Sequence, residues 1–306
     1  MTQVSRAVRL AIGITLVGAC VAAQSATINT STITNLSAGG GATFQYISTT
    51  YLGALSTSDG NVNNTNFDAY DHANTLQVGG VNYSPAQADL TGQTYSGFVQ
   101  SFGGLDTTLQ YHADSTLPLL RSFAEFTNTT GAAISTTVTW QHNLGADSST
   151  QIVSSGSGDT SFGADDAWLV TDDYSVGGGD PTTSFRWYGP GTVLTQNATF
   201  MTTTFNAAGD QGPRANYQLA VAPGETVSLL WFSGMHTGAG SGTNAANLMS
   251  SLDSLADGDA LLTGLSATQL AQTANWSFGA TVPEPGTVAM LGLGLLALTA
   301  RRRRIG

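Results

Sequence analysis

The residues with the clearest capacity for chemistry are six aspartates gathered within 22 positions of the chain. Calcium takes roughly six to eight oxygen ligands, and loops between strands can supply them. Gly156, Gly158 and Gly163 would allow the tight backbone of such a loop. The spacing matches neither an EF-hand nor a glycine-aspartate nonapeptide repeat, so aspartates that cap turns are the alternative. The predicted calcium ligands are Asp159, Asp165, Asp166, Asp172, Asp173 and Asp180.

Hydrolytic chemistry needs a nucleophile beside a base, or two carboxylates across a cleft. The sequence contains no Gly-x-Ser-x-Gly elbow, and adjacent strand residues such as Asp71 and His72 face opposite ways. The four histidines stand singly and without metal-binding spacing. We therefore predict no enzymatic activity and no cofactor except calcium, with a secreted hydrolase as the second alternative function. The histidines are His72, His112, His142 and His236.

A sugar-binding face is a further possibility, because such faces place aromatic rings beside Asp, Asn and Gln side chains. The predicted carbohydrate residues are Trp187, Tyr188 and Tyr174. The alternative is that Trp187 and Phe185 are core residues on one strand face, with Tyr188 and Arg186 on the other. A calcium- or carbohydrate-binding module is therefore the first alternative function.

Short β-strands must position these residues. From Ile134 to Trp140 one face carries Ile, Thr, Val and Trp while the other carries Ser and Thr. This period of two predicts a strand over 134–142 with one buried face. The turn-forming residues at 128–132 predict a hairpin between this strand and another over 119–128.

The remaining runs extend the same pattern. Pro223 and Gly224 predict a type II turn before a fully buried strand over 227–232. Hairpin-like spacing throughout favours an all-β fold, an antiparallel β-sandwich or jelly roll. Further strands are predicted at 44–51, 94–102, 107–112, 151–155, 167–171, 183–188, 193–205 and 216–221.

Helical patterns occur only near the C-terminus of this region. Leu248, Leu252 and Leu255 repeat at helical spacing. Ser266 and Gln269 form a capping-box pattern that predicts the start of a second short helix. We expect one or two short helices packed on the sandwich.

The charge of the region between the two ends is strongly negative. Positions 24–282 hold 19 acidic residues and three arginines, and the whole chain contains no lysine. Nucleic acid and anionic lipid both bind clustered basic residues, so we expect no nucleic-acid binding. The five tryptophans argue against disorder and for a packed core.

The N-terminal segment has the order of a cleaved export signal. Arg6 and Arg9 precede an apolar run over 10–21, and small residues follow up to Ala26. The run is shorter than the roughly 20 residues that span a bilayer. Cys20 follows a weak match to a lipobox, so its lipidation is an open alternative to a plain signal peptide over 1–25.

The C-terminal segment is more specific. A Pro-Glu-Pro motif precedes an apolar stretch over 288–300 and four consecutive arginines. In order and placement this resembles the PEP-CTERM sorting signal, whose family members are exported, cut near the motif by an exosortase and released. The residues on which the resemblance rests are Pro283, Glu284, Pro285, Arg301, Arg302, Arg303 and Arg304.

The apolar stretch allows two membrane interpretations. Residues 287–300 reach about 21 Å as a helix, short of a hydrocarbon core of about 30 Å. Side-chain snorkelling could close the gap, and the arginines would stay cytoplasmic. We predict a transient inner-membrane anchor, with a permanent tail anchor as the alternative.

These observations predict three segments: a signal peptide over 1–25, a β-sandwich body over 26–281 and a sorting tag over 282–306. The expected function is that of an exported surface or extracellular-matrix protein, processed by an exosortase and associated with exopolysaccharide in a structural or adhesive role. The exosortase is the expected protein partner. The resemblance covers the tag alone and carries no activity to the body.

Overall fold

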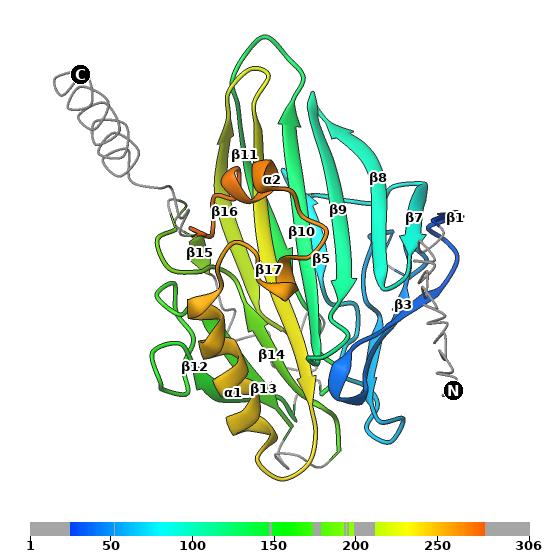
Figure 1. Cartoon of the computed structure of the whole chain (residues 1–306), viewed down its shortest axis with the longest axis vertical. Coiled ribbons are helices and arrows are strands. Elements are labelled where there is room, and N and C mark those ends of the chain that lie inside the picture. Colours follow the sequence, from blue (N-terminus) through cyan, green and yellow to red (C-terminus); the bar gives the residue numbers. More distant parts are fainter. Residues whose placement is uncertain are drawn as a thin grey trace, which may run out of the picture.

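Antiparallel strands form three sheets in the described part of the chain, and the helices lie over one side of the largest sheet (Figure 1). The computed structural model describes residues 25–51, 53–146, 149–173, 179–192, 194, 196–198 and 212–278. The predicted sorting tag and all but the last residue of the predicted signal peptide lie outside these residues. The predicted all-β sandwich with short helices near the C-terminus is confirmed.

The largest sheet has nine strands, and its neighbours pair antiparallel throughout. In spatial order they are β1 (Ala26–Asn29), β7 (Gln87–Thr91), β8 (Thr94–Phe102), β9 (Leu105–Ala113), β10 (Leu119–Asn128), β17 (Thr226–His236), β14 (Thr182–Arg186), β13 (Trp168–Asp172) and β12 (Gln151–Ser155). The central strands β10 and β17 are buried over most of their length, as predicted for 227–232.

Two smaller sheets complete the β layers. The five-stranded sheet contains β15 (Gln196–Ala198), β16 (Arg214–Val221), β11 (Ile134–Gln141), β5 (Thr75–Val78) and β6 (Val81–Asn82). The three-stranded sheet contains β2 (Thr34–Ser37), β3 (Ala42–Ile47) and β4 (Asp59–Val62), with the 3-10 turn η1 (Gly39–Gly41) between the first two.

The main core lies between the largest sheet and the two smaller ones. Trp140 of β11 and Trp231 of β17 stack across it with ring centroids 4.4 Å apart and planes at 3°. The indole of Trp231 donates a hydrogen bond to the Tyr217 hydroxyl at 2.9 Å. Offset aromatic pairs with a satisfied polar tip are well suited to such a core.

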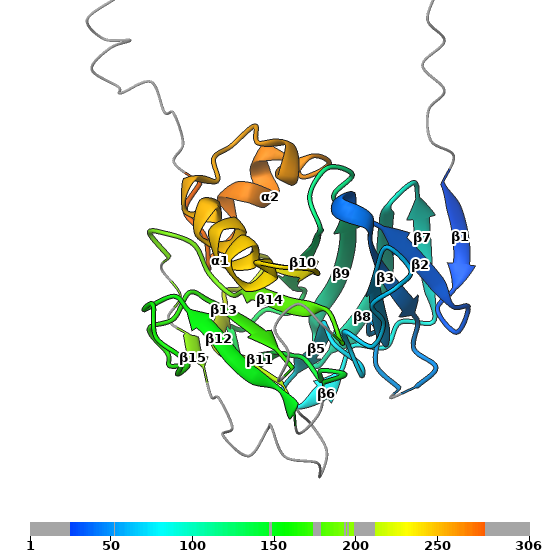
Figure 2. The same cartoon turned by 90° about the horizontal axis from the view of Figure 1, so that it is seen from below.

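The helices cover the opposite face of the largest sheet, so the described body has three layers (Figure 2). Apolar residues of β10, β13 and β17 pack there against helical residues, among them Ala245 and Met249. This layer contains α1 (Ser241–Ser251), η3 (Leu252–Ser254), η4 (Ala260–Leu262) and α2 (Ala267–Ala271).

Two buried arginines fasten this helical layer to the sheet. Arg186 donates to the Met249 carbonyl and the Asp253 carboxylate, and its Nε lies 3.0 Å from the Tyr188 carbonyl oxygen. Its guanidinium also lies 5.3 Å from the Trp276 ring. Removing this arginine would leave several acceptors unpaired.

Arg121 of β10 plays the same part further along the sheet. Its Nη1 donates to the carbonyl oxygens of Leu261 and Thr263 at 2.8 and 2.9 Å, and its Nη2 donates to Gln110 at 2.8 Å. Burial lowers the pKa of Arg121 to about 10, which leaves it charged at neutral pH.

The predicted hairpin between 119–128 and 134–142 is wrong. β10 belongs to the largest sheet and β11 to the five-stranded sheet, so residues between them cross from one layer to the other. The segment after β16 crosses back to β17 in the same way. Asn128 ties the two crossings together, because its Nδ2 donates to Ala132 and Val221 carbonyls at 2.8 and 2.9 Å.

The helical predictions hold in part. Ser266 and Gln269 form the predicted capping box at the start of α2. The first helix begins earlier than the leucine repeat suggests, and its buried face carries Ala245 and Met249 rather than Leu248. Within the described residues, no helix is long and apolar enough to cross a membrane.

Candidate functional site

The turn that joins β12 to β13 contains three of the predicted calcium ligands. Asp166 is 2% exposed, and its two carboxylate oxygens accept the amides of Ser157 and Gly163, each at 2.7 Å. A carboxylate that accepts backbone amides in a turn stabilises that turn. The buried carboxylate of Asp166 therefore stabilises the conformation of this turn.

Asp159 serves the same turn from its exposed side. Its Oδ1 accepts the Ser161 amide at 2.8 Å and the Ser155 hydroxyl at 3.1 Å. The Ser161 hydrogen bond is the main reason that the pKa of Asp159 is lowered. Asp165 is exposed, and its backbone carbonyl accepts the Tyr188 hydroxyl at 2.8 Å.

The other three aspartates lie at the far end of β13. Asp166 and Asp172 are six residues apart along an extended strand, which corresponds to about 20 Å. The six predicted calcium ligands therefore do not lie together in one cluster. Among the residues that the structure describes, no group of three or more His, Cys, Asp or Glu side chains is arranged to hold a metal ion.

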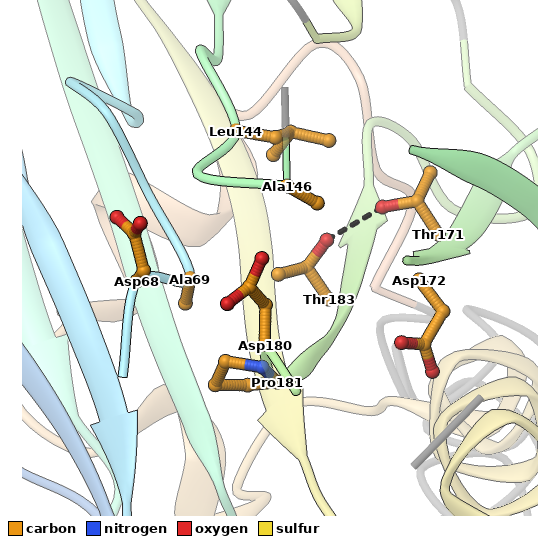
Figure 3. Close-up of a pocket in the computed structure, with 9 residues that line it drawn as sticks. All are labelled: Asp68, Ala69, Leu144, Ala146, Thr171, Asp172, Asp180, Pro181 and Thr183. Atoms are coloured by element: carbon orange, nitrogen blue, oxygen red, sulfur yellow. Dashed lines mark hydrogen bonds between the residues drawn. The ribbon is translucent and has the colours of Figure 1, made fainter. Parts of the chain in front are cut away.

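Asp172 and Asp180 line a small cavity with Asp68, which comes from the segment between β4 and β5 (Figure 3). The cavity measures about 10 Å³, room for about one water molecule. Thr171 and Thr183 close one side with a 2.6 Å hydrogen bond between their hydroxyls. A sugar ring does not fit in this volume.

Asp172 also has a structural connection away from this cavity. Its carboxylate accepts the Thr182 hydroxyl and, at 2.9 Å, the Asp173 amide. The Thr182 hydroxyl lies 2.6 Å from the Ser241 hydroxyl at the first residue of α1. Asp172 thereby links β13 and β14 of the largest sheet to the N-terminus of α1, where a negative charge is favourable.

The structure contradicts the predicted sugar-stacking role of Trp187. Its side chain is 0% exposed and packs between Phe162 and Phe185, with ring centroids 4.7 and 6.0 Å away. The alternative that assigned Trp187 to the core is the correct one. Tyr188 is half-buried and packs against the same core, and Tyr174 lies outside the described residues.

The contact between Ser58 and His72, which has the elements of a nucleophile and a base, was not predicted from the sequence. The Ser58 hydroxyl lies 2.9 Å from Nδ1 of His72, and the Tyr51 ring lies 5.5 Å from the imidazole. Burial lowers the pKa of His72, which favours the neutral, basic imidazole at pH 7. The two residues are 14 positions apart in a segment without regular pattern, so sequence spacing could not pair them.

His72 also has an unusual backbone. Its φ of 81° lies in the left-handed region, which non-glycine residues seldom adopt. In the described residues, every non-glycine residue with positive φ falls between Tyr46 and Asn74. Four of the six are Asn or Asp, which tolerate this conformation, so His72 and Tyr46 carry most of the strain.

The other histidines serve the fold. His142 is buried, accepts the Asn74 amide at Nδ1 and packs 4.1 Å from the Phe185 ring. Burial lowers the pKa of His142 well below its usual value and that of His236 to about 4. His112 lies 2.8 Å from the Thr94 hydroxyl, and burial also lowers its pKa.

Comparison with known structures yields remote similarities. The chain resembles a heparan sulfate lyase HepC mutant from Pedobacter heparinus at 10% identity and a TM-score of 0.32, over 56% of this chain and 21% of the lyase. It resembles a putative kojibiose phosphorylase from human microbiome at 6% identity and a TM-score of 0.37, over 63% of this chain and 27% of the phosphorylase. It resembles a putative aldose 1-epimerase from Klebsiella pneumoniae at 8% identity and a TM-score of 0.29. This match covers 55% of this chain and 58% of the epimerase.

The chain spans about a fifth to three fifths of the length of these three structures, and similarity at this level assigns no function. No curated protein sequence matches the chain significantly. The family model described as the PEP-CTERM protein-sorting motif matches residues 281–304, which include the Pro-Glu-Pro motif, the apolar stretch and the four arginines. The chain therefore carries a PEP-CTERM protein-sorting motif, the mark of an exported exosortase substrate.

Proposed function

We propose that the chain is released by an exosortase near Pro283–Pro285 and then acts at the cell surface or in the extracellular matrix. Its role there is structural or adhesive, without catalysis, and associated with exopolysaccharide. Before cleavage the C-terminal apolar segment holds it in the inner membrane. The sorting motif at residues 281–304 is the observation that carries this proposal.

The end of the folded body supports processing at this boundary. Trp276 donates from Nε1 to the Leu230 carbonyl at 2.9 Å, and its ring stacks on Phe278 at 6.1 Å. Five residue steps separate Phe278 from Pro283, a reach of at most roughly 18 Å. A cut near Pro283 would therefore remove the membrane segment and leave these packing contacts intact.

The use of polar side chains in the body supports a structural role. Asp166 stabilises a turn, Asp172 links a strand to α1, and Arg121 and Arg186 fasten the helical layer. His142 packs in the core. Ionisable groups committed to folding in this way are consistent with a durable extracellular scaffold.

The processing step is tested by fractionation of cells that express the full chain with an exosortase. We expect Glu284→Gln to shift the protein from the released fraction to the membrane fraction. Glu225→Gln, the same change in an exposed turn of the body, is the matched control and should be released normally. Equal release of both variants would show that the Pro-Glu-Pro motif does not direct processing.

The structural role is tested on the released protein. We expect it to sediment with exopolysaccharide purified from its own host, and to leave the chain length of that polymer unchanged over days. Shortening of the polymer, or failure to sediment with it, would contradict the proposed role.

A secreted hydrolase is the second candidate because of the Ser58–His72 contact. A serine activated by a neighbouring base reacts with fluorophosphonate probes. Labelling of the wild type that is lost in Ser58→Ala and retained in Ser56→Ala would favour the hydrolase. Ser56 is the suitable control, since its hydroxyl lies 3.3 Å from that of Ser58.

A further inference from the structure

A second cavity lies on the opposite side of the largest sheet from the main core. It has a volume of about 230 Å³, far more than the roughly 10–15 Å³ needed to hold one water molecule. The loop between β9 and β10 forms one wall and the segment from η3 to η4 forms the other. Its lining residues are Asp114, Thr116, Leu117, Ser251, Leu252, Ser254, Leu255, Asp259, Ala260 and Leu261.

Four leucines give this cavity an apolar surface. Leu252, Leu255 and Leu261 are 2%, 8% and 7% exposed, and Leu117 is half-buried. Apolar walls with a few polar groups are typical of sites for small organic ligands. The volume suits one compact carbon skeleton, such as a single sugar ring or a short alkyl chain.

Asp114 provides the charged group of the cavity. It is only 7% exposed, and its Oδ1 accepts three hydrogen bonds: from the amide and hydroxyl of Thr116 at 2.8 and 2.7 Å and from the Leu117 amide at 2.7 Å. Within the described residues, its Oδ2 accepts no hydrogen bond. A carboxylate is thus fixed in position with one oxygen left for a ligand.

The hydrogen bonds to Asp114 favour its ionised form. Burial alone would raise its pKa, but the hydrogen bonds from Thr116 and Leu117 outweigh burial and lower it. Asp259 adds a second carboxylate at the exposed rim, where its Oδ1 accepts the Leu261 amide at 2.9 Å. The lining residues include no Lys, Arg or His, and the basic groups that act electrostatically on Asp114, Arg121 and His112, lie outside the lining.

We propose that this cavity binds a primary ammonium group on a compact carbon skeleton, with the ammonium at Oδ2 of Asp114 and the carbon atoms against the leucines. Asp259 contributes a second attraction at the rim. The ammonium has two natural sources, a free amino sugar of a surface polysaccharide or a small alkylamine. Only the amino-sugar source would connect this site to the proposed function, and the site itself does not depend on that function.

Calorimetric titration of the full chain in detergent tests the site with three probes. Glucosamine presents an ammonium on a sugar ring, N-acetylglucosamine presents the same ring without the charge, and n-butylammonium presents the charge without a ring. We expect glucosamine or n-butylammonium to bind and N-acetylglucosamine to bind at least tenfold more weakly. The stronger of the two cations identifies the source of the ligand.

Variants localise the binding. Asp114→Asn keeps the Oδ1 acceptor and removes the charge, so affinity should fall by about tenfold or more. Asp257→Asn removes a charge from the same exposed loop but not from the lining, and should change affinity by less than about twofold. Ser254→Phe fills the cavity from a lining position and should abolish binding.

Three outcomes would overturn the proposal. These are no binding of either cation, equal binding of glucosamine and N-acetylglucosamine, or equal loss in Asp114→Asn and Asp257→Asn. Circular dichroism of each variant checks that it is folded. If Asp114→Asn does not fold, retained binding in Ser254→Phe would still refute the cavity as the site. The readout is independent of exosortase processing, so it can fail while the proposed function stands.

Discussion

Asp166 and Asp114 show how differently two buried aspartates are used in this molecule. Asp166, in the turn between β12 and β13, gives both carboxylate oxygens to backbone amides. Asp114, in the loop between β9 and β10, receives three hydrogen bonds on one oxygen and faces a cavity of about 230 Å³. The sequence places the first in a dense acidic cluster and the second alone. The density of carboxylates in the sequence therefore does not show which carboxylate oxygens the fold leaves without a hydrogen bond.

The largest expected effect is the loss of the Asp166 contacts. Asp166→Ala removes a buried carboxylate that accepts two backbone amides of the turn, so we expect the free energy of unfolding to fall by about 3 kcal/mol. Urea denaturation measures this change. Asp165→Ala, at the exposed neighbouring position, should change it by no more than about 0.5 kcal/mol. Similar losses of unfolding free energy in both variants would show that the buried carboxylate stabilises the turn no more than the exposed one does.

As the pH falls, the free energy of unfolding should decrease first because a buried histidine becomes protonated, and only at lower pH because aspartates do. The folded-state pKa of His236 is lowered from 6.5 to about 4, so the unfolded chain binds more protons in this range. Stability should therefore fall as the pH falls from about 6.5 to 4. The lowered pKa of Asp114 means that its contribution is lost only at still lower pH.

Urea denaturation at several pH values measures this dependence. His236→Gln should reduce the loss between pH 6.5 and pH 4 by about 2 kcal/mol, allowing for partial exposure of the ring. An unchanged slope in this variant would mean that His236 is not held neutral by the fold.

A smaller effect separates the two oxygens of Asp114. Asp114→Ala should lower the free energy of unfolding by about 2 kcal/mol, because the amides of Thr116 and Leu117 lose their acceptor. Asp114→Asn keeps an acceptor there and should lower it by less than about 1 kcal/mol. Thermal denaturation of the two variants in parallel gives the comparison. Equal losses would indicate that Oδ2 has a structural role as well.

Calcium should have the smallest effect. A ligand present at 100 times its dissociation constant adds about 2.7 kcal/mol to stability. Because β13 divides the predicted ligands, we expect millimolar calcium to change the free energy of unfolding of the body by less than about 0.5 kcal/mol. If calcium raised the free energy of unfolding by about 2 kcal/mol and Asp172→Asn abolished this rise, the result would indicate a calcium site at the far end of β13.

Strand positions were predictable wherever local pattern and burial agree. The predicted bounds 94–102, 119–128 and 151–155 coincide with β8, β10 and β12. The residue types within each of these strands were enough to locate it. Sheet membership was not predictable at 128–134. Turn-forming residues there serve a crossing between layers, which Asn128 stabilises by donating to the carbonyl of Val221, 93 residues away.

The sites were harder to predict than the fold. Trp187 has the sequence surroundings of a sugar platform, but its side chain points into the core, where burial of so large a ring is favourable. The Ser58–His72 contact and the Asp114 cavity join residues 14 and about 140 positions apart. Neither pairing matches a known motif spacing in this sequence. The sorting motif was predictable because it is contiguous.

Release of this protein by an exosortase can be measured from the intact mass of the released form. The full chain with an internal tag is expressed in two hosts, one with and one without an exosortase. We expect a released form that ends near Pro283–Pro285, only in the host with the enzyme. An uncut chain in the membranes of both hosts would contradict it and leave a permanent tail anchor.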